Sequence, residues 1–136
     1  MDIHISEHDV HCIATAVYTE VNMQSLEEKL GVINVIMNRV RSKRFGRDVC
    51  EVVYARGQFI GIENMMKANE KNIDQETLLK TKLLVVDTLF FKKHKNPVGD
   101  SLYFHDDSVD MRYIWDKKPN VKIGRMVFYL WLKKNL

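Results

Sequence analysis

Hydrophobic residues recur at helical spacing through the first two thirds of the chain and follow an extended pattern in the last third. A first helix is predicted over about residues 7–22, because Ser6 and Asp9 form an N-terminal cap ahead of apolar positions spaced three and four apart. A second helix starts at the capping box of Ser25 and Glu28, and apolar residues cover nearly its whole circumference. The second helix is therefore expected to be the central, buried one.

Two further helices follow in the predicted pattern. The second helix should end near residues 45–46, and a short helix follows the cap at Asp48. The last helix starts at Asp74 and stops before a turn at residues 96–100. The side chains of the last helix expected to face the core are Leu78, Leu79, Leu83, Val86, Leu89 and Phe90.

The last third of the chain is predicted to be extended. Residues 101–105 are typical of a short strand, and residues 122–132 of a longer one that follows a turn at 117–120. Tyr103 and His105 should share one face of the first strand, because successive side chains alternate between the two faces. Helices followed by strands indicate an α+β fold with a small antiparallel sheet.

Length and composition are those of an ordinary globular protein. The chain has 136 residues, a net charge of +3 and 46% hydrophobic residues, and residues 1–136 are expected to form one domain because no linker or repeat divides them. The longest apolar run, Met126 to Leu132, is far shorter than the roughly 18 residues of a membrane-spanning helix. The N-terminus lacks the basic and apolar regions of a secretory signal peptide, so synthesis in a cytoplasm without Sec export is expected.

Cysteine and histidine give no strong metal-binding pattern in this sequence. Cys12 and Cys50 are too few for a disulfide scaffold and lie in apolar stretches, so both are predicted to be buried and reduced. His8 and His11 lie three apart on the first helix, a spacing that can face two imidazoles toward one metal, and His4 lies just upstream. No HExxH or CxxC motif accompanies them, so they are interpreted as solvated residues, and no metal or other cofactor is predicted.

Basic residues gather in two stretches that contain no acidic residue. Such stripes either face solvent or bind a polyanion, which could be nucleic acid or an anionic envelope polymer. The sequence carries no helix-turn-helix, zinc-finger or RNP-type signature, so no nucleic-acid partner is predicted. The first stretch holds Arg39, Arg41, Lys43, Arg44 and Arg47, and the second holds Lys117, Lys118, Lys122, Arg125, Lys133 and Lys134.

Glu20 is the first candidate for catalysis. It lies one helical turn beyond Val17, on the margin of the apolar stripe of the first helix. Partial burial disfavours a charged carboxyl group and can raise the pKa of a glutamate from about 4.3 toward 6, where it can donate a proton near neutral pH. Helix geometry alone favours the simpler interpretation that Glu20 reaches past the stripe into water.

A series of short motifs extends this observation along the chain from about residue 10 to 129. The motifs are Ala16-Val17-Tyr18-Thr19-Glu20, Asn38-Arg39-Val40, Val52-Val53-Tyr54, Gly57-Gln58-Phe59, Ser101-Leu102-Tyr103-Phe104-His105, Trp115 and Ile123-Gly124. In this order and spacing they resemble the SleB-like cell wall hydrolases, which include the spore-cortex-lytic enzymes. The resemblance implies a lysozyme-like α+β domain that cleaves the glycan strands of peptidoglycan.

The catalytic acid of the family corresponds to Glu20. By analogy, Glu20 would protonate the oxygen between N-acetylmuramic acid and N-acetylglucosamine, then take the proton of the muramic C6 hydroxyl as a 1,6-anhydro ring closes. Hydrolysis by a muramidase would need a second carboxylate at a set separation. The acidic residues available for that role are Glu63, Asp106, Asp107, Asp110 and Asp116. None of these acids follows Glu20 in a recognisable catalytic pattern, so lytic transglycosylation is favoured over hydrolysis. A non-enzymatic protein that binds glycan or another polyanion on the same fold stays open.

The resemblance also suggests substrate contacts. Gln58 and Phe59 would lie in a loop facing the cleft, Tyr103 and His105 would line the strand side, and Trp115 could stack on a sugar ring.

Two other positions of the motif series are interpreted differently. Asn38 is expected to hold the buried helix in place through hydrogen bonds, because a polar amide in an apolar helix needs partners. The family commonly continues A-R-G-E after the catalytic glutamate, whereas this chain has Gln24 in place of the second glutamate, so any charge role there is absent.

A wall-degrading enzyme without a signal peptide is typical of bacteriophages. The chain is therefore expected to be an endolysin that reaches the periplasm or wall through a holin, or a muralytic protein carried in the virion; a bacterial catalytic domain would give the same sequence. Its expected partners are peptidoglycan glycan strands and, through the lysine-rich C-terminus, anionic envelope polymers. A monomer without membrane insertion is expected.

Overall fold

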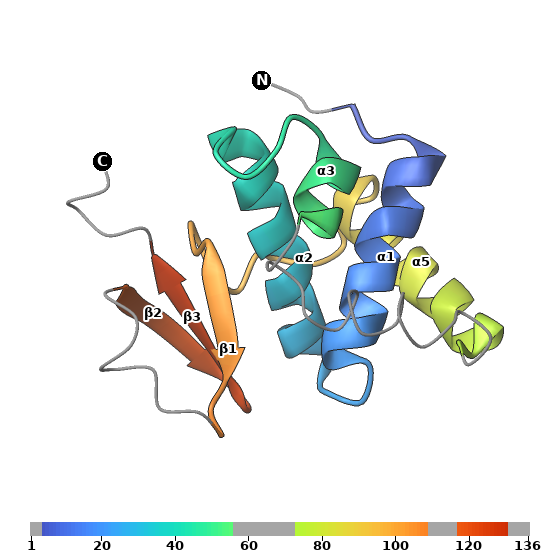
Figure 1. Cartoon of the computed structure of the whole chain (residues 1–136). Coiled ribbons are helices and arrows are strands. Elements are labelled where there is room, and N and C mark those ends of the chain that lie inside the picture. The colour runs from blue at the N-terminus through green and yellow to red at the C-terminus, as the bar shows by residue number, and fades with distance from the viewer. Residues whose placement is uncertain (1–3, 56–72, 109–116, 131–136) are drawn as a thin grey trace.

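Helices precede strands along the chain, as the sequence predicts. The computed structural model describes residues 4–55, 73–108 and 117–130. The described elements are α1 (Glu7–Val21), α2 (Leu26–Ser42), α3 (Val49–Tyr54), α5 (Gln75–Leu89), β1 (Tyr103–Asp106), β2 (Lys118–Ile123) and β3 (Met126–Leu130). In Figure 1 the sheet lies on one side of α2, and α1 and α5 lie on the other. The α+β class is confirmed.

The predicted capping residues start the helices. At α1 the Asp9 amide donates to Ser6 Oγ at 3.1 Å and the Ser6 amide donates to Asp9 Oδ2 at 2.9 Å, which satisfies backbone donors that the helix itself leaves unpaired. Ser25 and Glu28 form the same reciprocal box at α2. Helix α2 ends at Ser42, slightly before the predicted end, and is capped by Lys43, whose φ of 60° is left-handed.

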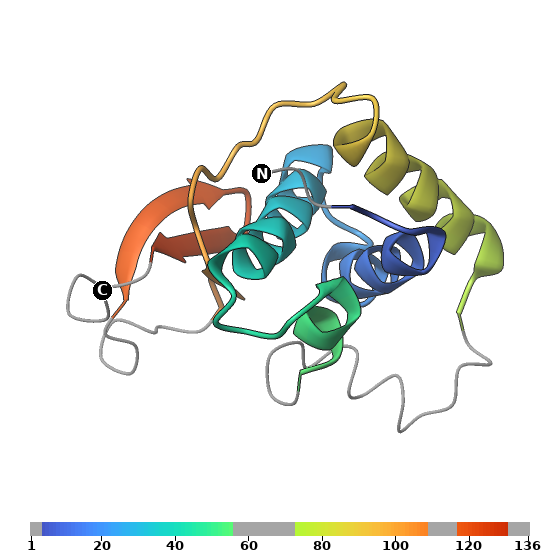
Figure 2. The same ribbon diagram turned by 90° about the horizontal axis from the view of Figure 1, so that it is seen from above.

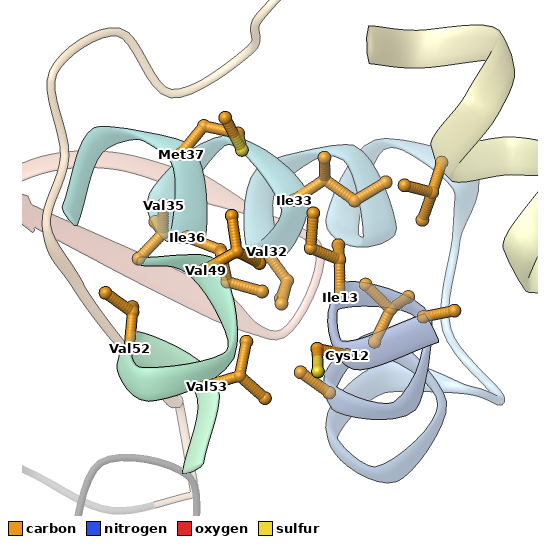
Figure 3. Close-up of a cluster of buried hydrophobic side chains, with 14 of the residues drawn as sticks. Cys12, Ile13, Val32, Ile33, Val35, Ile36, Met37, Val49, Val52 and Val53 are labelled. Carbon is orange, nitrogen blue, oxygen red and sulfur yellow. The ribbon is translucent and has the colours of Figure 1, made fainter. Parts of the chain in front are cut away.

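Helix α2 is the centre of the core. Figure 3 shows its Ile33 and Ile36 among side chains from α1 and α3, and both isoleucines are fully buried. Seen from above in Figure 2, α2 lies between the sheet and α1. Burying such a side chain contributes about 1.5–3 kcal/mol. The predicted central position of the second helix is confirmed. None of the described helices is both long and apolar enough to span a membrane.

The three strands form an antiparallel sheet in the order β1-β3-β2. The predicted turn at residues 117–120 is wrong, because Lys118 to Asn120 are the first residues of β2. Pro119 is compatible with that strand because β2 lies at the edge of the sheet, where a missing backbone donor is tolerated. The chain turns instead at Gly124, whose φ is +55°, and so divides the predicted long strand in two.

Helix α5 packs on α1 through a narrower face than predicted. Leu78 and Val85 are buried there, and Val86 and Leu89 pack against the core from its margin. The expectation that Leu79, Leu83 and Phe90 also face the core is wrong: they are 57%, 56% and 51% exposed. Among the described elements α5 packs mainly on α1, and a helix that packs along one side leaves its other side to solvent.

A buried carboxylate fixes the β2–β3 turn against the start of α2. Glu28 is only 4% exposed, and its Oε1 accepts hydrogen bonds from the Ser25 amide at 3.2 Å and from Ser25 Oγ at 2.8 Å. Glu28 Oε2 accepts the Arg125 amide at 3.3 Å. A Cβ at Gly124 would lie 2.5 Å from Glu28 Oε1, so this turn requires glycine for space as well as for its backbone angle.

Gly31 allows the sheet to approach α2 closely. A Cβ on Gly31 would lie 2.5 Å from Cζ of Phe128, which is fully buried on β3. Gly31→Ala is expected to lower the free energy of unfolding by about 1–2 kcal/mol, because the overlap outweighs the better helix propensity of alanine. Chemical denaturation measures the change. In a Phe128→Leu background the same substitution should become neutral or stabilising; an equal loss in both backgrounds would contradict the contact.

Candidate active site

Glu20 lies in the last turn of α1 and is half-buried, as its place at the margin of the apolar stripe predicts. Val17 and Val21 on the same helix are buried in the core, so the helix is held firmly beneath this side chain. Thr19 is tied to the helix by a hydrogen bond from its Oγ1 to the Ala16 carbonyl at 3.1 Å. The carboxyl group is thus presented from a rigid helix end.

Arg39 of α2 connects Glu20 electrostatically with β1. The Arg39 side chain is 3% exposed, and burial lowers the pKa of its guanidinium to about 10. Tyr103, when ionised, and Glu20 oppose that shift because a nearby negative charge favours the protonated guanidinium. At neutral pH Arg39 is therefore a buried positive charge within electrostatic reach of both candidate residues.

Two consecutive side chains of α2 position the backbone that leads into β1. Asn38 Nδ2 donates to the carbonyl oxygens of Gly99 at 2.8 Å and Ser101 at 3.0 Å. Arg39 Nε donates to the carbonyl oxygen of Leu102 at 2.7 Å. The expected anchoring role of Asn38 is confirmed, and the first residue of β1 is fixed relative to α2.

Tyr103 is surrounded by aromatic and basic groups. Its ring meets the ring of Phe45 edge-on with centroids 5.7 Å apart, and the Arg39 guanidinium carbon lies 5.5 Å from its centroid. Lys117 Nζ lies 4.6 Å from the same centroid. Burial raises the pKa of the Tyr103 phenol, an effect that Arg39 and Arg44 partly offset, so Tyr103 is neutral at physiological pH.

His105 lies on the same face of β1 as Tyr103. Its ring stacks on Tyr129 with centroids 5.1 Å apart, and His105 Nε2 lies 2.5 Å from the Tyr129 hydroxyl oxygen. Phe104 lies on the other face, with its ring centroid 6.0 Å from that of Phe128 in the core. The predicted alternation of side chains along this strand is confirmed.

The structure thus connects some of the predicted site residues and leaves others untested. The Arg39 guanidinium lies against the Tyr103 ring, and His105 lies two residues beyond Tyr103 on β1. The negative charge of Glu20 favours the charged form of Arg39. The remaining predicted contacts, Gln58, Phe59 and Trp115, lie outside the described residues.

Arg39 is the residue whose part in the site the sequence did not predict. Its interpretation as part of a basic stripe facing solvent or a polyanion is wrong, because it is buried, whereas Arg41, Lys43, Arg44 and Arg47 of that stretch are exposed. The available signal was its place inside a helix that is apolar nearly all round, where a charged residue needs a partner.

The prediction that Cys12 and Cys50 are reduced is also wrong. The two residues form a disulfide between α1 and the first turn of α3, with Cα atoms 5.5 Å apart. An apolar setting suits a disulfide as well as a thiol, and two cysteines 38 residues apart carry no sequence signal of pairing. His8 lies beside them, with its ring nitrogen and both sulfurs within 4.8 Å of one another. Because the sulfurs are bonded to each other, neither is the thiolate that binds metals.

The sequence of the chain matches a known protein family. A profile described as Cell Wall Hydrolase matches residues 23–129. The chain belongs to this cell wall hydrolase family. The match begins three residues after Glu20, so it covers the buried helix, Tyr103 and His105 but does not assign the glutamate.

Curated relatives of this family member are spore cortex-lytic enzymes. Those of Bacillus cereus and Oceanobacillus iheyensis are 28% and 27% identical over 124 residues, which is 90% of this chain. The enzyme of Bacillus subtilis is 25% identical over 127 residues. The chain spans less than half of each relative, 44%, 42% and 38% respectively.

Solved structures share the fold over nearly the whole chain. The catalytic domain of the Bacillus cereus SleB protein superposes with a TM-score of 0.71 at 25% identity, covering 95% of this chain and 94% of that domain. The catalytic domain of the germination-specific lytic transglycosylase SleB from Bacillus anthracis gives the same score and identity, covering 95% and 99%. The described helices and sheet are therefore those of a SleB-type catalytic domain.

Proposed function

We propose that the chain is one muralytic catalytic domain that cleaves peptidoglycan between N-acetylmuramic acid and N-acetylglucosamine as a lytic transglycosylase. The observation that carries the proposal is the half-buried carboxyl group of Glu20 at the end of α1. Its negative charge favours the charged form of the buried Arg39, whose guanidinium carbon lies 5.5 Å from the Tyr103 ring centroid. A SleB-type fold and a relative described as a lytic transglycosylase support the reaction class.

Glu20 serves both proton transfers in this reaction. As a carboxylic acid it gives its proton to the glycosidic oxygen while the bond from that oxygen to C1 of the muramic residue breaks. As a carboxylate it then takes the proton of the muramic C6 hydroxyl, whose oxygen bonds to C1 and closes the 1,6-anhydro ring. Glu20 ends protonated and no water is consumed, so one carboxyl group completes the cycle.

The other carboxylates described near the sheet have structural partners, which supports a mechanism with a single carboxyl group. Asp107 lies 3.2 Å from Lys122 and 3.9 Å from Arg125, and Asp106 lies 3.7 Å from Arg125. Asp106 also accepts the Ser108 amide at 2.8 Å, a hydrogen bond that lowers its pKa. Hydrolysis would require a second carboxylate to hold water or attack the sugar. The other candidates, Glu63, Asp110 and Asp116, lie outside the described residues.

Tyr103 and His105 are the described residues proposed to contact the glycan strand. The Tyr103 ring, flanked by Phe45 and Lys117, offers an aromatic surface for a sugar face. His105 lies further along the same face of β1, where its ring nitrogen meets the hydroxyl group of Tyr129 on β3. Gln58, Phe59 and Trp115 stay predicted contacts.

The proposed place of action is the cell wall, outside the cytoplasm. The Cys12–Cys50 disulfide supports this, because disulfides form and persist in oxidising compartments such as the periplasm. Delivery by a bacteriophage, attraction to anionic envelope polymers and the monomeric state stay predictions.

Digestion of purified sacculi tests the proposal. Mass spectrometry of the released muropeptides is expected to show 1,6-anhydro-muramic ends. Reducing muramic ends without anhydro products would instead identify a muramidase, and the absence of any soluble glycan product would contradict cleavage altogether.

A further inference from the structure

Three side chains of the kinds that bind zinc meet where α1 and α3 are joined. A ring nitrogen of His8 and the sulfur atoms of Cys12 and Cys50 all lie within 4.8 Å of one another. Imidazole nitrogen and thiolate sulfur are the usual ligands of structural zinc sites. His8 lies in the first turn of α1 and Glu20 in its last, about 18 Å further along the helix axis, so this group is separate from the candidate active site.

The two helices hold the three side chains in place. His8 and Cys12 are four residues apart on α1, so their side chains lie on the same face of the helix, one turn apart. Cys50 lies in the first turn of α3, opposite Cys12. Cys12 is fully buried, Cys50 is partly buried and His8 is exposed, so a metal ion can reach the group from the His8 side.

Asp9 supplies a fourth ligand atom. Its Oδ1 lies 3.8 Å from Cys50 Sγ, whereas its Oδ2 accepts the Ser6 amide at 2.9 Å in the cap of α1. The cap therefore fixes the carboxylate with one oxygen toward the cysteines. Two sulfurs, one nitrogen and one oxygen complete the tetrahedral set that zinc takes in proteins.

The disulfide and a metal ion exclude each other at this place. Two sulfurs bound to one tetrahedral zinc ion lie about 3.8 Å apart, given Zn–S bonds of about 2.3 Å, whereas bonded sulfurs lie about 2.0 Å apart. Reduction by a phosphine breaks the S–S bond and gives two thiols, while the phosphine takes up the oxygen of a water molecule. Zinc then replaces the two thiol protons and forms two Zn–S bonds.

We propose that His8, Cys12 and Cys50, with Asp9 as the fourth ligand, form a zinc site in the reduced chain, and that disulfide formation releases the metal. Helices α1 and α3 are then cross-linked in either redox state, by zinc in a reducing compartment and by the disulfide in an oxidising one. The inference does not depend on the proposed glycan chemistry.

The test is a titration of the metal-free full chain with cobalt(II), which replaces zinc in tetrahedral sites and gives absorption bands with thiolate ligands. Protein reduced with a phosphine should bind about one equivalent, at least about a hundredfold more tightly than the oxidised protein. Zinc should displace the cobalt. Zinc should also raise the melting temperature of the reduced protein by about 5 °C or more, because it binds the folded chain preferentially.

Two variants with matched side-chain changes test the ligand set. His8→Ala should weaken cobalt binding to the reduced protein by about 10–100-fold or more, since even partners outside the ligand shell contribute that much. His94, beyond the end of α5, belongs to no such group among the described residues, and His94→Ala should leave the affinity unchanged. Cys50→Ala removes one thiolate and should abolish tight binding.

Two results would overturn the inference: reduced wild type that is folded by circular dichroism but shows no thiolate–cobalt absorption, or equal cobalt affinity in His8→Ala and wild type. If reduction unfolds the chain, added zinc should restore its circular dichroism spectrum, and failure to do so would equally overturn it. None of these measurements uses sacculi, so their outcome is separate from that of the proposed function.

Discussion

Glu20→Gln is expected to reduce the rate of sacculus solubilisation by about 10³-fold, because an amide can neither give the proton to the glycosidic oxygen nor take one from the C6 hydroxyl. The side chains are nearly equal in size, and Glu20 is half-buried at a helix end, so the melting temperature should change little. Turbidity of a sacculus suspension measures the rate, and thermal unfolding checks the fold.

A matched control for Glu20 is available on another helix. Glu76 lies exposed in the first turn of α5, and its carboxylate lies 3.8 Å from Lys80 Nζ. Glu76→Gln makes the same chemical change and should retain full activity. Undiminished activity in Glu20→Gln would favour a different catalytic group, whereas an inactive wild type that still binds sacculi would favour the non-enzymatic glycan-binding alternative.

Loss of the Cys12–Cys50 disulfide is expected to have the largest effect on stability. The bond joins residues 38 apart and restricts the unfolded chain, which corresponds to about 3–4 kcal/mol in the chain-entropy account. Cys50→Ala, or reduction of the wild type with a dithiol, should therefore lower the melting temperature by roughly 10 °C. Thermal unfolding with and without reductant measures the change.

The variant without Cys50 provides the control for that experiment, because added reductant should leave its melting temperature unchanged. Thiol titration of denatured, unreduced wild type should find no free thiol at Cys12 or Cys50. Two free thiols, together with no effect of reductant, would contradict the cross-link between α1 and α3.

The parts of the fold that the sequence predicted well rest on local signals. Ser6 with Asp9, and Ser25 with Glu28, cap their own helices through residues three apart, so the reciprocal hydrogen bonds can be anticipated from spacing alone. The predicted turn at residues 117–120 is wrong because Pro119 resembles a turn residue unless its edge position in the sheet is known.

The parts of the site that the sequence did not predict depend on contacts between distant segments. Arg39 meets the Leu102 carbonyl across 63 positions, and Cys12 meets Cys50 across 38, and neither pairing has a periodic or motif signature. Glu20 could be placed at the margin of its helix, but its coupling to Arg39 required the packing of α1 against α2. Residue type and spacing therefore suggest a candidate acid, whereas its electrostatic environment comes from the tertiary structure.

The most direct test of the central claim compares the end groups of muropeptides released from one batch of sacculi by wild type and by Glu20→Gln. Proton donation and acceptance by a single glutamate predict 1,6-anhydro-muramic ends with wild type and about a thousandfold slower release with the variant. Release of the same anhydro products at the wild-type rate by Glu20→Gln would contradict it.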